Sequence, residues 1–122
     1  MTLSLVTERN IQLFMQLAQM PSCRVSTDMY WQTATYETYL NYRRGRMHIS
    51  QCLPLDSYDS NLLLLALHRW QPARFAGIPQ RFFQLRRGLV MSCSPAADSA
   101  AELWLLLHRR QQAFLESLCK PQ

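Results

Sequence analysis

Glycine and lysine are scarce in this 122-residue chain, which holds three glycines and one lysine. The glycines are isolated from one another, so the sequence has no glycine-rich loop of the kind that holds phosphates. Its longest apolar run, Leu62–Leu67, falls well short of the roughly 20 residues that a membrane-spanning helix needs. The N-terminus has neither a basic segment nor a long apolar stretch, so we expect a cytoplasmic protein without a secretion signal.

Motifs of catalysis and metal binding are also missing. The cysteines are far apart and lack the spacing of zinc ligands; they are Cys23, Cys52, Cys93 and Cys119. We therefore expect free and mostly buried thiols in a reducing compartment, and no cofactor. The sequence has no paired carboxylates and no GxSxG or HExxH motif, and no spacing joins a histidine to a nucleophile. We expect no enzymatic activity.

Basic residues are present in excess, and they are concentrated in the middle of the chain. Residues 41–90 hold eight arginines against two aspartates, whereas the whole chain has a net charge of +5. Arginine forms paired hydrogen bonds with carboxylates and phosphates, so this region predicts an acidic partner. Because no RNP-like or helix-turn-helix signature accompanies the aromatic residues, we favour a protein partner. A small basic nucleic-acid-binding or regulatory protein is the alternative.

Apolar periodicity predicts three helices. We expect Thr7 to cap the first helix and Pro21 to end it, with Glu8 in its first turn. The second runs over Leu62–Trp70, and residues 56–59 offer its cap. The third begins at a capping box, Ser99–Glu102. Its predicted apolar face consists of Leu103, Leu106, Leu107, Phe114 and Leu118.

Two histidines lie close to the predicted ends of helices. His68 and His108 are each followed by arginine, at positions where a positive charge is favoured. We interpret them as ordinary residues of late helical turns, with a pH-responsive pair as the alternative.

Alternating patterns predict strands, with the tripeptide Arg-Arg-Gly at the turns of two hairpins. A short strand is expected near residues 29–31. In the first hairpin, every second residue from Tyr36 to Tyr42 lies on one face, and Gly45 supplies the positive φ of the turn.

The second hairpin is predicted to be apolar on both sides. Its turn is placed at Arg87-Gly88, with Phe82 and Val90 facing away from Phe83 and Leu89. Together with the leucine run of the second helix, this exceeds what one packed face needs and predicts a subunit interface. Burial of both faces within the monomer is the alternative.

The predicted fold is a single α+β domain over residues 1–122. Its element order is α-β-β-β-α-β-β-α, with an antiparallel sheet packed with helices. This order is similar to that of the small class I chaperones of type III secretion systems.

Six segments carry a closer resemblance. They resemble the SsaM/CesL-like components of type III secretion gatekeeper complexes over nearly the whole chain, least at residues 20–35 and 51–60. The specificity of the match lies in the number, order and spacing of these segments. They are TERNIQLFMQLA (7–18), YETYLNY (36–42), GIPQR (77–81), MSCSP (91–95), AELWL (101–105) and FLES (114–117).

The resemblance implies a non-enzymatic chaperone or regulatory subunit. It would bind a gatekeeper protein of the SsaL/SepL kind and a second small chaperone-like protein of the SpiC/SepD kind, and so control the order of translocator and effector secretion. In the chaperone fold, the middle helix and the strands after it form the subunit interface, and a partner segment wraps around the sheet and first helix. Secretion chaperones are usually acidic, so this basic chain suits a heterodimer with an acidic sister, with a homodimer of the isolated chain as the alternative.

The resemblance and the residue patterns together assign three sets of binding residues. At the subunit interface we place Leu63, Leu67, Trp70 and Phe82. Near the bound partner segment we place Leu13, Phe14 and Leu17. As electrostatic guides we assign Arg43, Arg44, Arg46, Arg86 and Arg87.

Overall fold

The computed structural model describes residues 3–33, 35–54 and 60–119, and it confirms the predicted α+β fold and element order. The cap predicted at residues 56–59 lies outside the described ranges. A short 3₁₀ helix occupies part of the loop after the second helix. The elements are α1 (Leu5–Leu17), β1 (Asp28–Gln32), β2 (Glu37–Arg43), β3 (Arg46–Pro54), α2 (Ser60–Arg69), η1 (Pro72–Phe75), β4 (Arg81–Leu85), β5 (Gly88–Cys93) and α3 (Ala101–Leu118).

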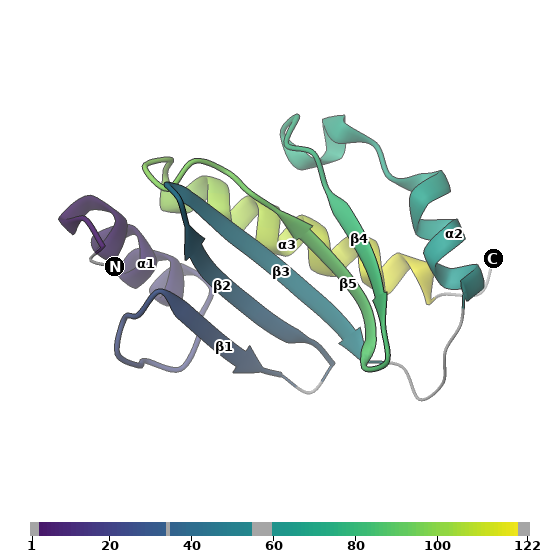
Figure 1. The fold of residues 1–122 in the computed structure, drawn as a ribbon, viewed down its shortest axis with the longest axis horizontal. Coiled ribbons are helices and arrows are strands. Elements are labelled where there is room, and N and C mark those ends of the chain that lie inside the picture. Colours follow the sequence, from purple (N-terminus) through teal and green to yellow (C-terminus); the bar gives the residue numbers. More distant parts are fainter. Residues whose placement is uncertain (1–2, 34, 55–59, 120–122) are drawn as a thin grey trace.

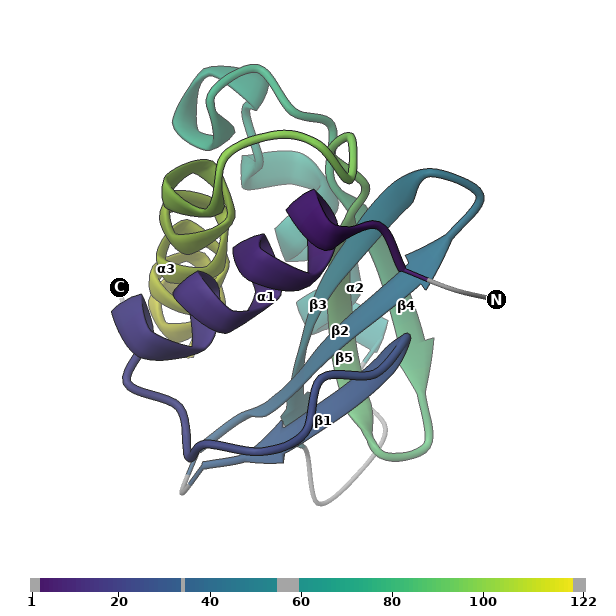
Figure 2. The ribbon, with the colours of Figure 1, turned by 90° about the vertical axis from the view of Figure 1, so that its left-hand side faces the viewer.

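Within the described ranges the strands form one antiparallel sheet in the order β1-β2-β3-β5-β4. Figures 1 and 2 show α1 and α3 on one face of this sheet. Helix α2 lies beside β4, the strand at one edge of the sheet. The core lies between the sheet and the two covering helices, and it includes the fully buried Phe14, Leu40, Ile49 and Trp104. No helix of the described residues covers the opposite face, which we call the outer face.

The ends of two helices differ from the prediction. Ser4, not Thr7, caps α1, because the Thr7 N–H donates to the Ser4 hydroxyl oxygen at 3.1 Å. The capping box predicted for α3 is wrong, since Ala100 is the N-cap and offers no side-chain oxygen. The Ser99 hydroxyl instead accepts from Trp104 Nε1 at 2.9 Å, because a buried indole N–H requires an acceptor.

The first hairpin forms as predicted. Arg43 pairs with Arg46, and the turn residues Arg44 and Gly45 both have positive φ, 50° and 75°. This left-handed pair is typical of the two-residue turns whose twist matches that of the flanking strands. Tyr36, Thr38 and Leu40 are buried as expected on the covered face of the sheet.

The second hairpin has a different register from the predicted one. Leu85 pairs with Gly88, so its turn is Arg86–Arg87 and not Arg87-Gly88. Phe82 therefore pairs with Met91 on the covered face, and the prediction that Phe82 lies on the outer face is wrong. The outer face carries Phe83 opposite Val90. The hairpin is apolar on both sides as predicted, but Phe83 shares a face with Val90, where Phe82 had been expected.

Candidate protein-binding surface

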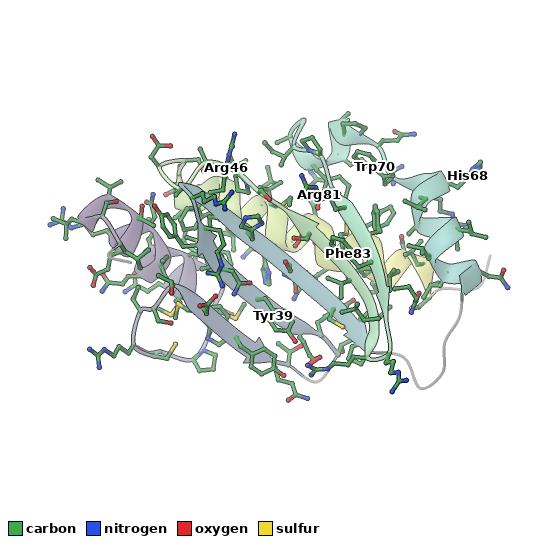
Figure 3. The ribbon with its side chains drawn as sticks, in the orientation of Figure 1. Tyr39, Arg46, His68, Trp70, Arg81 and Phe83 are labelled. Carbon is green, nitrogen blue, oxygen red and sulfur yellow. The ribbon has the colours of Figure 1, made fainter. Side chains whose placement is uncertain are left out.

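Four large apolar side chains are exposed on two neighbouring elements at the β4 edge of the sheet. Leu64 and Leu67 of α2 are 63% and 50% exposed, and Phe83 and Leu85 of β4 are 47% and 50% exposed. We call these four residues the α2–β4 surface. Helix α2 packs against β4, where the Trp70 and Phe82 rings lie 6.4 Å apart, so the two elements are held together. Figure 3 shows Phe83 and Trp70 at this end of the molecule.

The residues predicted for the subunit interface differ in their accessibility. Leu67 is exposed, whereas Leu63 and Trp70 are half-buried against the core. Phe82 lies on the covered face, with its ring 5.7 Å from that of Phe114. Phe82 thus supports α2 from within the monomer. The prediction was right to place apolar surplus in these elements and did not single out the most exposed members.

The missed residues carry a signal that the sequence contains. Leu64 lies three positions before Leu67, which puts both side chains on one face of α2. Phe83 and Leu85 alternate in β4 and therefore share a face. Knowing that face required the register of the hairpin, which the tripeptide alone does not determine.

The residues predicted to contact a partner segment lie on α1. Leu13 and Leu17 are half-buried. Phe14 is fully buried, and its ring packs edge-on against His108 with centroids 5.5 Å apart. Phe14 therefore joins α1 to α3, and Leu13 and Leu17 are the accessible members of this set. Leu5 and Val6 are exposed apolar residues in the first turn of the same helix.

The five arginines predicted as electrostatic guides are all exposed, but they lie at opposite ends of the sheet. Arg46 begins β3, and Pro54 at the end of β3 pairs with Gly88, next to the second turn. Eight residue steps along a strand separate the two turns by roughly 27 Å. The arginines therefore form two separate positive regions: residues 43–46 and residues 86–87.

Two of these arginines form ion pairs within the described part of the chain. Arg43 forms an ion pair with Asp28 at 2.6 Å. Hydrogen bonds from the Asn41 amide and then from Arg43 lower the pKa of that carboxyl group. Arg87 forms an ion pair with the buried carboxylate of Glu37. The hydroxyl groups of two tyrosines also donate to this carboxylate, at 3.3 Å and 3.5 Å; they belong to Tyr30 and Tyr39.

This cluster differs from the β4 part of the α2–β4 surface, which lies on the same outer face. The Tyr30 and Tyr39 rings lie 5.0 Å apart, and burial followed by the Glu37 charge raises the pKa of Tyr39. The polar groups satisfy one another, so this part of the face is already occupied by its own side chains. The β4 part of the outer face has apolar side chains without such partners.

Helix α3 contains a buried polar residue that was predicted to lie near its end. His108 is in the middle of the helix and is 5% exposed. Its Nδ1 accepts from Gln51 Nε2 at 2.5 Å, and Gln51 Oε1 accepts from the Thr38 hydroxyl at 2.8 Å. Burial, with a smaller contribution from Arg109, lowers the pKa of His108 to about 4. His108 is therefore neutral at pH 7 and joins α3 to the sheet, whereas His68 lies in the last turn of α2 as predicted.

The thiols are free as predicted, but two of the four are exposed: Cys23 and Cys119. Burial raises the pKa of the Cys93 thiol to about 12, which leaves it protonated and a poor nucleophile. Within residues 3–33, 35–54 and 60–119, no group of three His, Cys, Asp or Glu side chains is placed to hold a metal ion. The helices of these ranges are also too short or too polar to cross a membrane.

Comparison with known proteins identifies the family of this chain. The SsaM family model matches residues 4–118 of the chain. The secretion system apparatus protein SsaM of Salmonella typhimurium is 57% identical over 115 residues, which are 94% of each chain. A match of this strength along nearly the full length of both chains leaves no element of the fold unmatched. The chain therefore belongs to the SsaM family of type III secretion proteins.

Proposed function

We propose that this protein is a non-enzymatic chaperone or regulatory subunit of a type III secretion gatekeeper complex in the cytoplasm. It binds a gatekeeper protein of the SsaL/SepL kind and a second small chaperone-like protein of the SpiC/SepD kind. In doing so it controls the order in which translocators and effectors are secreted. The observation that supports this role is the exposed α2–β4 surface in a chain of the SsaM family.

The energy of burying this surface and the charge beside it favour an acidic partner over a second copy of this chain. The four side chains are about half exposed, so covering them contributes on the order of 3–6 kcal/mol. Association costs about 4–15 kcal/mol, so further favourable contacts are required. Arg86 follows Leu85 directly and can supply them to an acidic surface. In a symmetric homodimer the same patch meets itself, which brings like charges together.

Co-expression with a gatekeeper and a small partner, followed by size-exclusion chromatography with light scattering, tests this proposal. The double substitution Leu64→Asp and Leu67→Asp should weaken complex formation by about 100-fold or more, because it places charges in a buried interface. The matched control is Leu106→Asp, at a leucine of α3 that is 40% exposed; it should leave the complex intact.

Two results would contradict the proposal. One is a chain that remains monomeric and binds neither partner. The other is equal weakening by Leu106→Asp, which would indicate a general effect of added negative charge. Retention on nucleic acid with a steep salt dependence would instead favour the nucleic-acid alternative.

A further inference from the structure

A second surface feature lies near the turn between β2 and β3. This turn is at the opposite ends of the strands from the turn between β4 and β5. Near the β2–β3 turn, an open pocket of about 660 Å³ is bounded by the start of β3, the segment before β4, the end of β5 and the first turn of α3. This volume is within the range of about 300–1,000 Å³ that is typical of ligand sites. Its lining residues are Arg46, His48, Ile78, Pro79, Arg81, Cys93, Ser94, Pro95, Ala96, Ser99 and Leu103.

The pocket is positively charged and contains no counter-charge of its own. Arg46 and Arg81 are exposed, and neither has a carboxylate partner among the described residues, where the ion pairs involve other arginines. Figure 3 shows both side chains at the same end of the sheet. No acidic side chain lines the pocket. Two guanidinium groups on one opening favour a negatively charged ligand.

Polar groups between the two arginines are already oriented. The His48 Nδ1 and the Ser94 hydroxyl are 2.9 Å apart, and Arg46 donates a long hydrogen bond of 3.4 Å to the Ser94 carbonyl oxygen. This single weak bond leaves the other guanidinium N–H groups of Arg46 available. Burial, and after it the charges of Arg81 and Arg43, lowers the pKa of His48. Arg46, His48 and Arg81 all line the pocket.

The other residues that line the pocket favour a peptide ligand over a nucleotide. They are mainly apolar and include Ile78, Pro79, Pro95 and Leu103. Among the described residues, no phenylalanine, tyrosine or tryptophan lines the pocket to provide the large ring faces on which bases stack in single-strand binders. Apolar walls beside two arginines suit a segment in which a carboxylate side chain has apolar neighbours.

We propose that this pocket binds an acidic side chain, Asp or Glu, flanked by apolar residues in an extended segment of a partner protein. Arg46 and Arg81 hold the carboxylate from its two sides, and the apolar lining covers the neighbouring residues. The inference rests on the proposed function insofar as the segment belongs to a binding partner. It adds a second contact site, at the opposite end of the sheet from Leu85 and the second turn.

The probe for a direct test is the peptide acetyl-Leu-Glu-Leu-Glu-Leu-amide, titrated into the ¹⁵N-labelled full chain and followed by NMR. Its matched control peptide has Gln in place of Glu. The Glu peptide should shift amide signals at the start of β3 and over residues 93–96, and the Gln peptide should bind about tenfold more weakly or not at all.

Two double variants with the same change in charge locate the effect. Arg46→Gln with Arg81→Gln should weaken binding of the Glu peptide by about tenfold or more. Arg24→Gln with Arg110→Gln, at exposed residues outside the pocket, should change it by less than about twofold because distant exposed charges are screened by salt.

Several outcomes would overturn the proposal. They are no binding of the Glu peptide, equal binding of both peptides, and equal weakening by both double variants. Inorganic phosphate or a short single-stranded DNA that binds the same residues at least as tightly as the Glu peptide would also overturn it, in favour of a general anion site or a nucleic-acid site. These experiments contain no gatekeeper, so their failure is distinguishable from a failure of complex formation in the co-expression experiment.

Discussion

The two hairpins share the tripeptide Arg-Arg-Gly and differ in where its glycine lies. In the first hairpin Gly45 is a turn residue, and a Cβ at that position would meet no atom within 4 Å. In the second, Gly88 is the first residue of β5, opposite Pro54 of β3. A Cβ built on Gly88 would lie 2.0 Å from the Leu53 carbonyl oxygen.

The difference follows from the positions of the strands. The first turn lies at the ends of β2 and β3, where a Cβ on Gly45 has open space, so its glycine is needed for backbone conformation alone, with a φ of 75°. Strand β5 lies between β3 and β4, and its first residue is pressed against the backbone of β3. Gly88 is needed for close approach as well as for its φ of 153°. One short sequence thus meets two unlike steric requirements.

The largest expected effect is that of Gly88→Ala. The added methyl group must displace the Leu53 carbonyl or shift β5, and we expect a loss of about 3 kcal/mol or more in the free energy of unfolding. Urea denaturation followed by circular dichroism measures it. A loss no larger than that of Gly45→Ala would contradict the distinction between the two glycines.

Acidification is expected to affect the two hairpins alike, because β3 is a strand of the first hairpin and pairs with β5 of the second. Gln51 of β3 contacts His108, whose pKa is lowered to about 4 in the folded chain. The unfolded chain binds a proton near pH 6.5 and the folded one does not, so stability present above that pH is lost as the pH falls towards 4. We expect a loss of about 2 kcal/mol between pH 7 and pH 5.

Urea denaturation at the two pH values measures this slope, and hydrogen exchange reports each hairpin separately. His108→Gln should reduce the slope, whereas His68→Gln, at an exposed position of α2, should leave it unchanged. Acid-induced opening confined to one hairpin would contradict the shared effect.

Gly45→Ala should have a smaller effect than either change. Space is available for the methyl group, so the cost is that of holding alanine in a left-handed conformation, about 1 kcal/mol. The same denaturation series measures it. A severe loss would show that the first turn has steric requirements beyond its φ.

The smallest expected effect is a difference in stability between substitutions of Arg87 and Arg86 in the second turn. Arg87→Gln removes the ion pair with the buried Glu37 carboxylate and should lower the urea midpoint slightly, whereas Arg86→Gln should leave it unchanged. High salt should weaken the difference, since Arg87 is largely exposed. Equal midpoints for the two variants at low salt would show that the ion pair does not stabilise the fold.

The helices and strands follow from local patterns that the sequence displays. Alternation from Tyr36 to Leu40 predicted that Tyr36, Thr38 and Leu40 share one face, and the left-handed turn at Gly45 was expected from glycine itself. The predictions that were wrong depend on how side chains pack in three dimensions. Ser99 bonds to the Trp104 indole, and Leu106, predicted for the apolar face of α3, is exposed because the sheet lies on another side of the helix.

The candidate binding surfaces were predicted in part for the same reason. The leucine run of α2 and the apolar second hairpin indicated the correct elements. Selecting Phe83 over Phe82 required the register of β4, which is set by the pairing of Leu85 with Gly88. The pocket near Arg46 joins segments that are up to 57 positions apart, and no local pattern indicates that they meet.

The sequence by itself therefore determined the order of the elements, the two hairpins and the excess of arginine, because these depend on residues within a few positions of one another. Only the tertiary structure decided which face of β4 is exposed, why Gly88 must be glycine, and that His108 is buried and neutral. Each of these depends on contact with a distant segment: Phe82 of β4 with Phe114, Gly88 with Leu53, and His108 with Gln51. Such contacts form only when the sheet and helices pack together.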